Sequence, residues 1–178
     1  MASLLLACGN DRSKQIKRSE DDVWSPPLTT MDIDPRCGAD IKWDLSKTGI
    51  PHCRLPFDDD TFDEIGAFNV LEHWGSQGDW KFYFTEFAEY WRILKPDGVM
   101  LIIVPIGVDA LADIGHTRFF SMDSFKFLAQ KWYEVELGKG KNVSDYRWFW
   151  KHNFETLHLE NIGNHHIGAI LKKVVLNG

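Results

Sequence analysis

The stretch LPFDDDTFDEIGAFNVLEHW, residues 55–74, decides the fold. An acidic loop leads into an apolar run that predicts a buried strand from about residue 62, and the run turns polar at Asn69. A second stretch, ILKPDGVMLIIVP at 93–105, ends a helix at Pro-Asp-Gly and then predicts another buried strand. Between the two stretches, Asp79 can cap a helix over about 80–94, whose apolar residues recur at helical spacing.

Further elements are predicted on both sides of this centre. A short helix is predicted within 10–27, and Ser121 can cap another helix. Strands are predicted at SLLLACG (3–9), LTTMDIDP (28–35), ADIKWDL (39–45), WYEVELG (132–138), FETLHLE (154–160) and HHIGAILKKVVL (165–176). This order indicates an α/β fold, a Rossmann-like, doubly wound and mostly parallel sheet that ends in an antiparallel C-terminal hairpin.

Composition narrows the class of protein. The 178 residues fit a single domain, 1–178, and the net charge of −6 argues against a broad nucleic-acid surface. The basic run at 12–18 is interpreted as a solvated segment. Three scattered cysteines, a first apolar run too short for a signal peptide and the lack of a membrane-spanning run predict a cytoplasmic protein without a disulfide framework.

Metal-ligating residues are present but poorly spaced. Cys37, His52 and Cys53 carry donor groups, yet no Cys-x-x-Cys pair occurs. The sequence therefore predicts no metal site.

Ligands of open α/β sheets bind at the carboxyl ends of the strands, where the strand order reverses. The residues that follow the predicted strands are Gly9, Asp32, Asp44, Asn69 and Pro105. A binding site, if the fold is as predicted, should be assembled from these positions.

Taken in order, these strand ends resemble the class I S-adenosylmethionine-dependent methyltransferases, most closely the small type 11-like branch. The resemblance covers residues 3–135, with 136–178 as C-terminal strands that complete the sheet. It is carried by LLLACGND (4–11), TTMDIDP (29–35), the two stretches quoted first and HTRFFSMDSFKFL (116–128). It implies the class I methyltransferase fold, S-adenosylmethionine as cofactor, and transfer of a methyl group to an unidentified, non-DNA acceptor by in-line displacement.

The resemblance also implies the cofactor contacts. Asp32, 23 residues after Gly9, would accept hydrogen bonds from the ribose, although it could instead cap a turn and Asp34 is a competing acid. Asn69 would face the methionine part of the cofactor. The remaining contacts are Ala7, Cys8, Gly9, Asn10 and Asp11 in the first loop, Ile33 beside Asp32, and Asp44 with Leu45 at the adenine.

Methyl transfer mainly requires that the acceptor, the methyl group and the sulfur are aligned, which needs few residues. A base helps only when the acceptor must lose a proton. His73 and His116 are the acid/base candidates, with Asn69 beside the methyl group. Arg118 could bind an anionic substrate or pair with an acid. The expected acceptor is a small molecule, sugar or peptide group. Amino-methylation of DNA bases is disfavoured because Asn69 begins NVLE and not NPPY, and neither a nucleic-acid partner nor a membrane role is expected.

The first loop departs from the family pattern. Leu5 replaces an acid or amide, and Ala7 and Asp11 replace glycines. These changes predict weaker cofactor binding and keep open a catalytically inactive methyltransferase-like fold that acts as a binding or structural partner. Few residues precede the first strand, so the pocket is expected to be open, or covered by a partner subunit or a second copy in a homo-oligomer.

Overall fold

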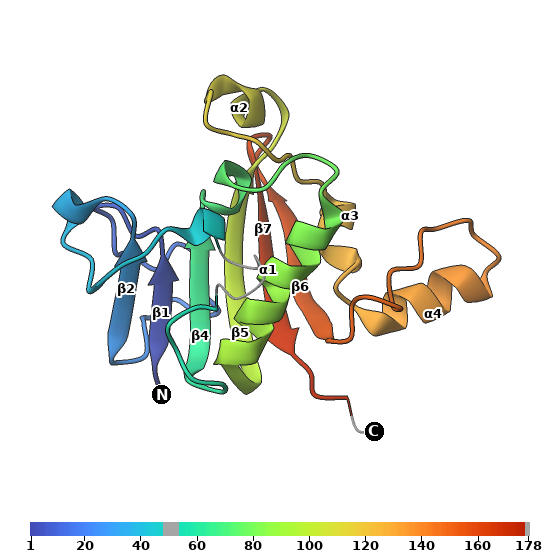
Figure 1. Cartoon of the computed structure of the whole chain (residues 1–178), viewed down its shortest axis with the longest axis horizontal. Helices are drawn as coiled ribbons and strands as arrows, with labels where there is room; N and C mark the ends of the chain where they lie inside the picture. The colour runs from blue at the N-terminus through green and yellow to red at the C-terminus, as the bar shows by residue number, and fades with distance from the viewer. Residues whose placement is uncertain (48–53, 177–178) are drawn as a thin grey trace.

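The computed structural model describes residues 1–47 and 54–176. Within these residues, seven strands form one sheet in the order β3-β2-β1-β4-β5-β7-β6 (Figure 1). The register pairs every neighbouring strand in parallel except β7, which runs against both β5 and β6. The strands are β1 Ser3–Leu6, β2 Leu28–Asp32, β3 Ile41–Lys42, β4 Phe62–Phe68, β5 Leu94–Pro105, β6 Phe154–Ile162 and β7 His166–Lys173.

This sheet confirms the predicted fold, that of the class I methyltransferases. The described helices are α1 Trp80–Ile93, α2 Gly107–Ala112, α3 Met122–Lys126 and α4 Gln130–Gly138, with 3-10 turns at Pro35–Cys37, Leu45–Lys47 and Leu71–His73. Helix α1 begins as predicted, because the Asp79 carboxylate accepts a hydrogen bond from the Phe82 N–H at 3.1 Å. Figure 1 shows α1 across one face of the sheet and α2 above the carboxyl ends of the parallel strands.

The strand predicted at 132–138 is wrong, because these residues lie in helix α4. The alternation of apolar and acidic residues resembles a strand pattern. In the helix, Tyr133 is fully buried and Leu137, four residues later, is half-buried, so the same residues also satisfy the helical period.

The short helix predicted within 10–27 is also wrong, since these residues form turns and extended chain. The segment covers the face of the sheet opposite α1, where Ile16 and Trp24 pack on buried strand residues such as Leu5. Trp24 can approach β4 closely because Gly66 has no side chain, and a Cβ there would lie 2.5 Å from the Trp24 ring.

Charges hold this segment on the sheet. The Lys14 side chain is 2% exposed, and its Nζ lies 2.6 Å from Glu64 Oε2 and 2.7 Å from Asp22 Oδ1. Glu64, on β4, also accepts hydrogen bonds from Ser3 Oγ at 2.8 Å and from the Ser25 N–H at 3.0 Å. The interpretation of the basic run as solvated is therefore wrong at Lys14, which is the centre of a buried charge cluster.

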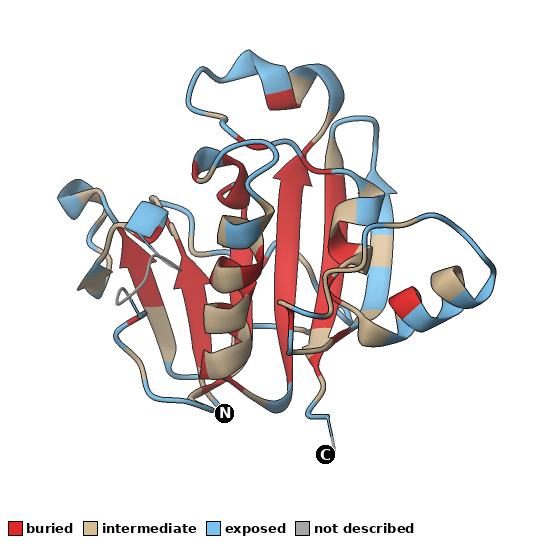
Figure 2. Cartoon of the chain, turned by 45° about the vertical axis from the view of Figure 1, so that its right-hand side comes forward, coloured by how far each residue is buried: buried red, intermediate tan, exposed pale blue. Residues whose placement is uncertain are grey.

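The main core lies between α1 and the sheet. The central strands are buried along most of their length, whereas the edge strand β6 is largely exposed (Figure 2). Among the described residues, no helix is both long and apolar enough to cross a bilayer.

Candidate active site at the carboxyl edge of the sheet

Strands β1 and β4 lie side by side, paired as Leu6 with Ala67, so the loops that follow them start at the same edge. Three residues of these loops, Ala7, Gly9 and Asn69, have left-handed backbone with φ between 44° and 51°. Asn69 is exposed, and its N–H donates to the Ile103 carbonyl of β5 at 2.8 Å. The structure therefore brings Asn69 next to the Gly9 loop.

Asp32 joins the first loop to the end of β2. Its Oδ2 accepts the Gly9 N–H at 2.8 Å and its Oδ1 accepts the Asp34 N–H at 2.8 Å. A carboxylate has about four lone-pair positions, so acceptor capacity remains. The competing acid, Asp34, is committed to Arg36, whose hydrogen bonds lower the Asp34 pKa to about 2.

Gly9 faces open space, because a Cβ built on it would meet no atom within 4 Å. Beside it, the Cys8 thiol is buried and burial raises its pKa to about 11, so Cys8 is present as a neutral thiol at neutral pH. Asn10 is exposed. Asp11 is exposed as well and accepts a hydrogen bond from the Ser13 N–H at 2.8 Å, so its carboxylate faces solvent.

The predicted adenine contacts differ in availability. Ile33 is 57% exposed beside Asp32, as an apolar clamp requires. Leu45 is buried in the core, which leaves its backbone as the part that a ligand could contact. Asp44 accepts hydrogen bonds from the Ser46 hydroxyl and N–H, and these bonds lower its pKa. At the position of the family's acid, Leu5 is 2% exposed and packs in the core.

His73 and His116 lie together beyond Asn69, with ring centroids 4.7 Å apart. Their Nε2 atoms lie 4.0 and 3.8 Å from Oε1 of the buried Glu72. Burial raises the Glu72 pKa to about 7, and burial together with the charge of His116 lowers the pKa of His73. The structure thus brings both acid/base candidates together, along with a carboxylate that the sequence did not single out as a site residue.

Arg118 pairs with an acid, one of the two alternatives that the sequence left open. Its Nη2 lies 2.6 Å from Oε2 of Glu86, a fully buried residue of α1 that also accepts hydrogen bonds from Trp74 Nε1 and Tyr90 Oη. An acid inside the apolar face of a predicted helix is the sequence signal for such a pair, but the partner lies 32 residues away.

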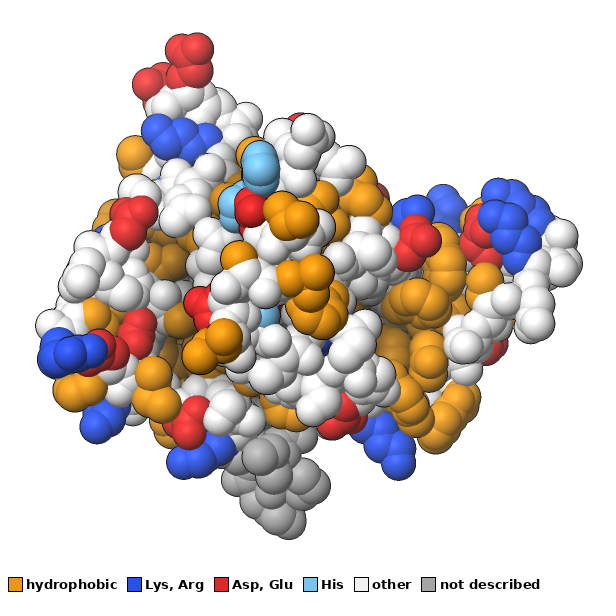
Figure 3. All heavy atoms as spheres, turned by 90° about the horizontal axis from the view of Figure 1, so that it is seen from above, with side chains coloured by type: hydrophobic (Ala, Val, Ile, Leu, Met, Phe, Trp, Pro, Cys, Tyr) orange, Lys and Arg blue, Asp and Glu red, His pale blue; other side chains and the backbone are white. Residues whose placement is uncertain are grey.

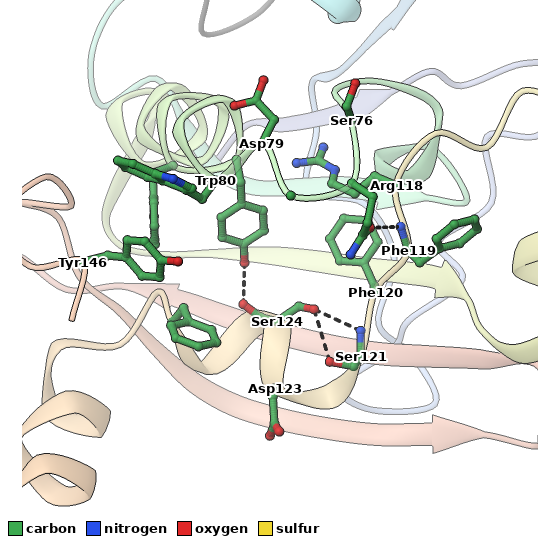
Figure 4. A pocket seen from close by; sticks show the side chains of 15 residues that line it. Ser76, Asp79, Trp80, Arg118, Phe119, Phe120, Ser121, Asp123, Ser124 and Tyr146 are labelled. Carbon is green, nitrogen blue, oxygen red and sulfur yellow. Dashed lines mark hydrogen bonds between the residues drawn. The ribbon is translucent and has the colours of Figure 1, made fainter. Parts of the chain in front are cut away.

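A hollow of about 270 Å³ lies between the start of α1 and the segment that leads into α3 (Figure 4). Seven of its fifteen lining residues are aromatic, including Trp80, Phe120 and Tyr146, and Asp79 and Asp123 also line it. Neither histidine lines the hollow, but Arg118 does, and the backbone N–H groups of Thr117 and Arg118 bond the Glu72 carbonyl at 2.9 and 3.2 Å, which ties this wall to the segment of His73. Seen from above, this edge presents hydrophobic, acidic and histidine side chains together (Figure 3).

The metal set considered from the sequence, Cys37, His52 and Cys53, lies only partly within the described residues. His52 and Cys53 lie outside the described residues. Donor atoms of Cys8, Asp32 and Cys37 lie within 4.8 Å of one another, but both Asp32 oxygens already accept backbone hydrogen bonds.

Residues 27–102 match a family model described as a methyltransferase domain. No curated protein matches the sequence. Solved structures of similar fold include a SAM-dependent methyltransferase from Methanosarcina mazei, with TM-score 0.54, 16% identity, and coverage of 98% of this chain and 93% of that one. The YcgJ protein of Bacillus subtilis has TM-score 0.53 and 14% identity, with 99% and 92% covered.

The identities are low, so these structures establish the fold alone, and the family match covers residues 27–102, less than half of the 178 residues. The match spans β2 through most of β5, which are the strands that carry Asp32 and Asn69. The chain thus carries a match to a methyltransferase domain over residues 27–102, and its strand order is that of the class I methyltransferase fold.

Proposed function

We propose that this protein transfers a methyl group from S-adenosylmethionine to a small, non-DNA acceptor. One observation carries the proposal. The open Gly9 loop follows β1, the Asp32 carboxylate accepts the Gly9 N–H, and Asn69 follows β4, the strand that neighbours β1. A methyltransferase of Burkholderia thailandensis with similar fold, TM-score 0.51 and 15% identity over 98% of this chain and 71% of that one, was crystallised with S-adenosylhomocysteine.

When bound, S-adenosylmethionine supplies a methyl carbon on a cationic sulfur, and an acceptor lone pair forms the new bond while the C–S electron pair stays on sulfur. In this chain, Asp32 would accept hydrogen bonds from the ribose diol through its remaining lone pairs. Gly9 lets backbone approach the cofactor tail. Asn69 and the residues after it orient the acceptor, and orientation supplies most of the catalysis in such a displacement.

The aromatic hollow is the proposed acceptor site. Its volume of about 270 Å³ is near the lower limit for ligand pockets, which favours a small acceptor, and Asp79 and Asp123 disfavour a polyanion. Arg118 adds no free positive charge because Glu86 neutralises it. The expected acceptor is therefore flat and either neutral or cationic, whereas nucleic acid is disfavoured. Cover from a second copy or a partner subunit stays a prediction; in one neighbouring structure, a Haloferax volcanii protein of similar fold is bound to the methyltransferase activator Trm112.

Asp32→Ala is expected to weaken S-adenosylmethionine binding by about 1–3 kcal/mol, because a charge-assisted hydrogen-bond acceptor is lost and the Gly9 N–H is released. Isothermal titration measures the affinity. Asp34→Ala is the matched control and should bind as the wild type does, since its carboxylate serves Arg36. Loss of binding in the control alone would show that the wrong acid was assigned, and a folded wild type that gives no heat would favour the inactive alternative.

Ala7→Gly is expected to tighten binding of the same cofactor several-fold. Ala7 has φ 44°, and left-handed backbone costs a non-glycine residue about 1–2 kcal/mol. Glycine removes both this strain and the methyl group that limits backbone approach, while its added freedom in the unfolded chain keeps stability within about 1 kcal/mol. Titration and thermal unfolding of the two proteins test both statements, and unchanged affinity would show that Ala7 does not limit binding.

A further inference from the structure

The carboxylate of Glu72 is the least satisfied polar group at this edge. The residue is 1% exposed, and within the described part of the chain neither of its side-chain oxygens has a hydrogen-bond partner. Buried carboxylates are normally paired or hydrogen-bonded, because burial without a partner costs several kcal/mol. Nε2 of His116 lies 3.8 Å and Nε2 of His73 4.0 Å from Glu72 Oε1, both beyond hydrogen-bond range. The backbone of Glu72 and Val70 and the charge of Arg118 also act on the carboxylate.

The orientation of the His116 ring does not supply the partner that the Glu72 carboxylate lacks. Its Nδ1 lies 2.9 Å from the Ala110 carbonyl oxygen, which can only accept, so Nδ1 carries the proton. When the ring is neutral, Nε2 therefore presents a lone pair toward the carboxylate. A carbonyl that fixes the far nitrogen of a histidine in this way is the usual outer support of a metal-ligating imidazole.

We propose that Glu72, His73 and His116 bind a divalent first-row transition ion such as Zn²⁺. Donor atoms of the three side chains lie within 4.8 Å of one another. An ion about 2.0–2.2 Å from each donor spans atoms up to about 4 Å apart. The two Glu72–histidine separations, 3.8 and 4.0 Å, fall within this span, and any donor pair nearer the 4.8 Å limit would have to close around the ion. Two imidazoles with one carboxylate suit such an ion and disfavour Mg²⁺ or Ca²⁺, which prefer oxygen ligands.

The backbone around the three side chains is built to hold them. The Thr117 and Arg118 N–H groups bond the Glu72 carbonyl, which ties the segment of His116 to that of His73. Gly115 makes room for His73, since a Cβ there would lie 3.3 Å from His73 Nδ1. The His73 side chain is 38% exposed, so the ion's free coordination positions face solvent on that side.

A bound ion would change the roles of the histidines. As ligands they would no longer accept the acceptor's proton, and the ion would instead lower the pKa of an acceptor hydroxyl bound to it. This role toward the acceptor rests on the proposed function, whereas metal binding itself does not.

The test is a metal titration of chelator-treated protein, with Co²⁺ absorption and Zn²⁺ calorimetry as readouts. The wild type should bind one ion per chain. Glu72→Gln and His116→Ala should each weaken binding by more than about tenfold, since each removes a ligand. His158→Ala, at a surface histidine paired with Glu160, and Cys37→Ser are the controls and should bind as the wild type does.

Thermal unfolding adds a readout that does not depend on affinity. In chelator, Glu72→Gln should be at least as stable as the wild type, because the amide removes an unpaired buried carboxylate. With Zn²⁺ the order should reverse, since ligand binding stabilises only the wild type. Equal Zn²⁺ binding by the wild type and Glu72→Gln, loss of binding in Cys37→Ser, or no saturable binding by the wild type would overturn the proposal, and none of these results bears on cofactor binding.

Discussion

Replacing Glu86 with alanine is expected to lower the free energy of unfolding by about 3–5 kcal/mol, because it leaves a buried guanidinium without its counter-ion. Glu86 is fully buried and Arg118 is 5% exposed. Within the described residues, Nε and Nη1 of Arg118 have no hydrogen-bond acceptor, so the carboxylate and the Leu71 carbonyl are what compensate its charge. Urea unfolding followed by circular dichroism measures the loss.

The double variant Glu86→Leu/Arg118→Met is the control. It removes both charges and should recover much of the stability, since apolar replacements of a buried ion pair are often neutral. Rings of Phe82, Tyr83 and Phe120 lie 5.2–5.7 Å from the guanidinium carbon, so methionine would still contact them. A double variant as unstable as Glu86→Ala would show that packing, and not the unpaired charge, sets the cost.

Lys14→Met is expected to cost about 3 kcal/mol, at the lower end for a broken buried pair because Glu64 keeps its bonds from Ser3 and Ser25. Urea unfolding again gives the value. Lys17→Met, an exposed change in the same basic run, should alter stability by less than about 0.5 kcal/mol. Equal effects of the two changes would contradict the buried cluster.

The buried charge cluster around Lys14 also predicts how the stability difference between the wild type and Lys14→Met depends on pH. Burial acts to raise the pKa of Asp22, but hydrogen bonds from Lys14 and Arg18 outweigh it and lower the pKa to about 2, from an ordinary value of 3.8. A lowered pKa in the folded state contributes stability above the unfolded pKa that is lost as pH falls toward the folded one. The deficit of Lys14→Met should therefore shrink between about pH 4 and pH 2.

The sheet could be predicted because its signals are local. The apolar runs of β4 and β5 are long, and Asp79 caps α1 through a residue three positions away. Helix α4 was missed because its alternation of apolar and acidic residues fits a strand as well as a helix. The segment 10–27 was misjudged because Lys14 finds its partner 50 residues away on β4, and nothing near it in sequence indicates burial.

For the candidate site, the sequence placed the strand ends and not the side-chain partners. The meeting of Asn69 and the Gly9 loop follows from strand order alone, so it could be anticipated. The grouping of Glu72 with His116 joins segments 44 residues apart, after different strands, and depends on how the loops fold back. The cofactor roles of Asp32, Ile33, Asp44 and Leu45 stay predictions that titration can test.

The segment 10–27 has one more consequence, which concerns local opening. It covers one face of the sheet but is neither helix nor strand. Most of its amides therefore lack the regular backbone hydrogen bonds that slow hydrogen exchange with solvent. Gly9 lies just before this segment and Asp32 follows it at the end of β2. Within the segment, Arg12 Nη2 donates a hydrogen bond to the Cys37 carbonyl, beyond β2, at 2.7 Å. When this segment lifts from the sheet, the two strand ends that we propose contact the cofactor lose their mutual support together, and a ligand that bridges them would slow hydrogen exchange along the whole segment.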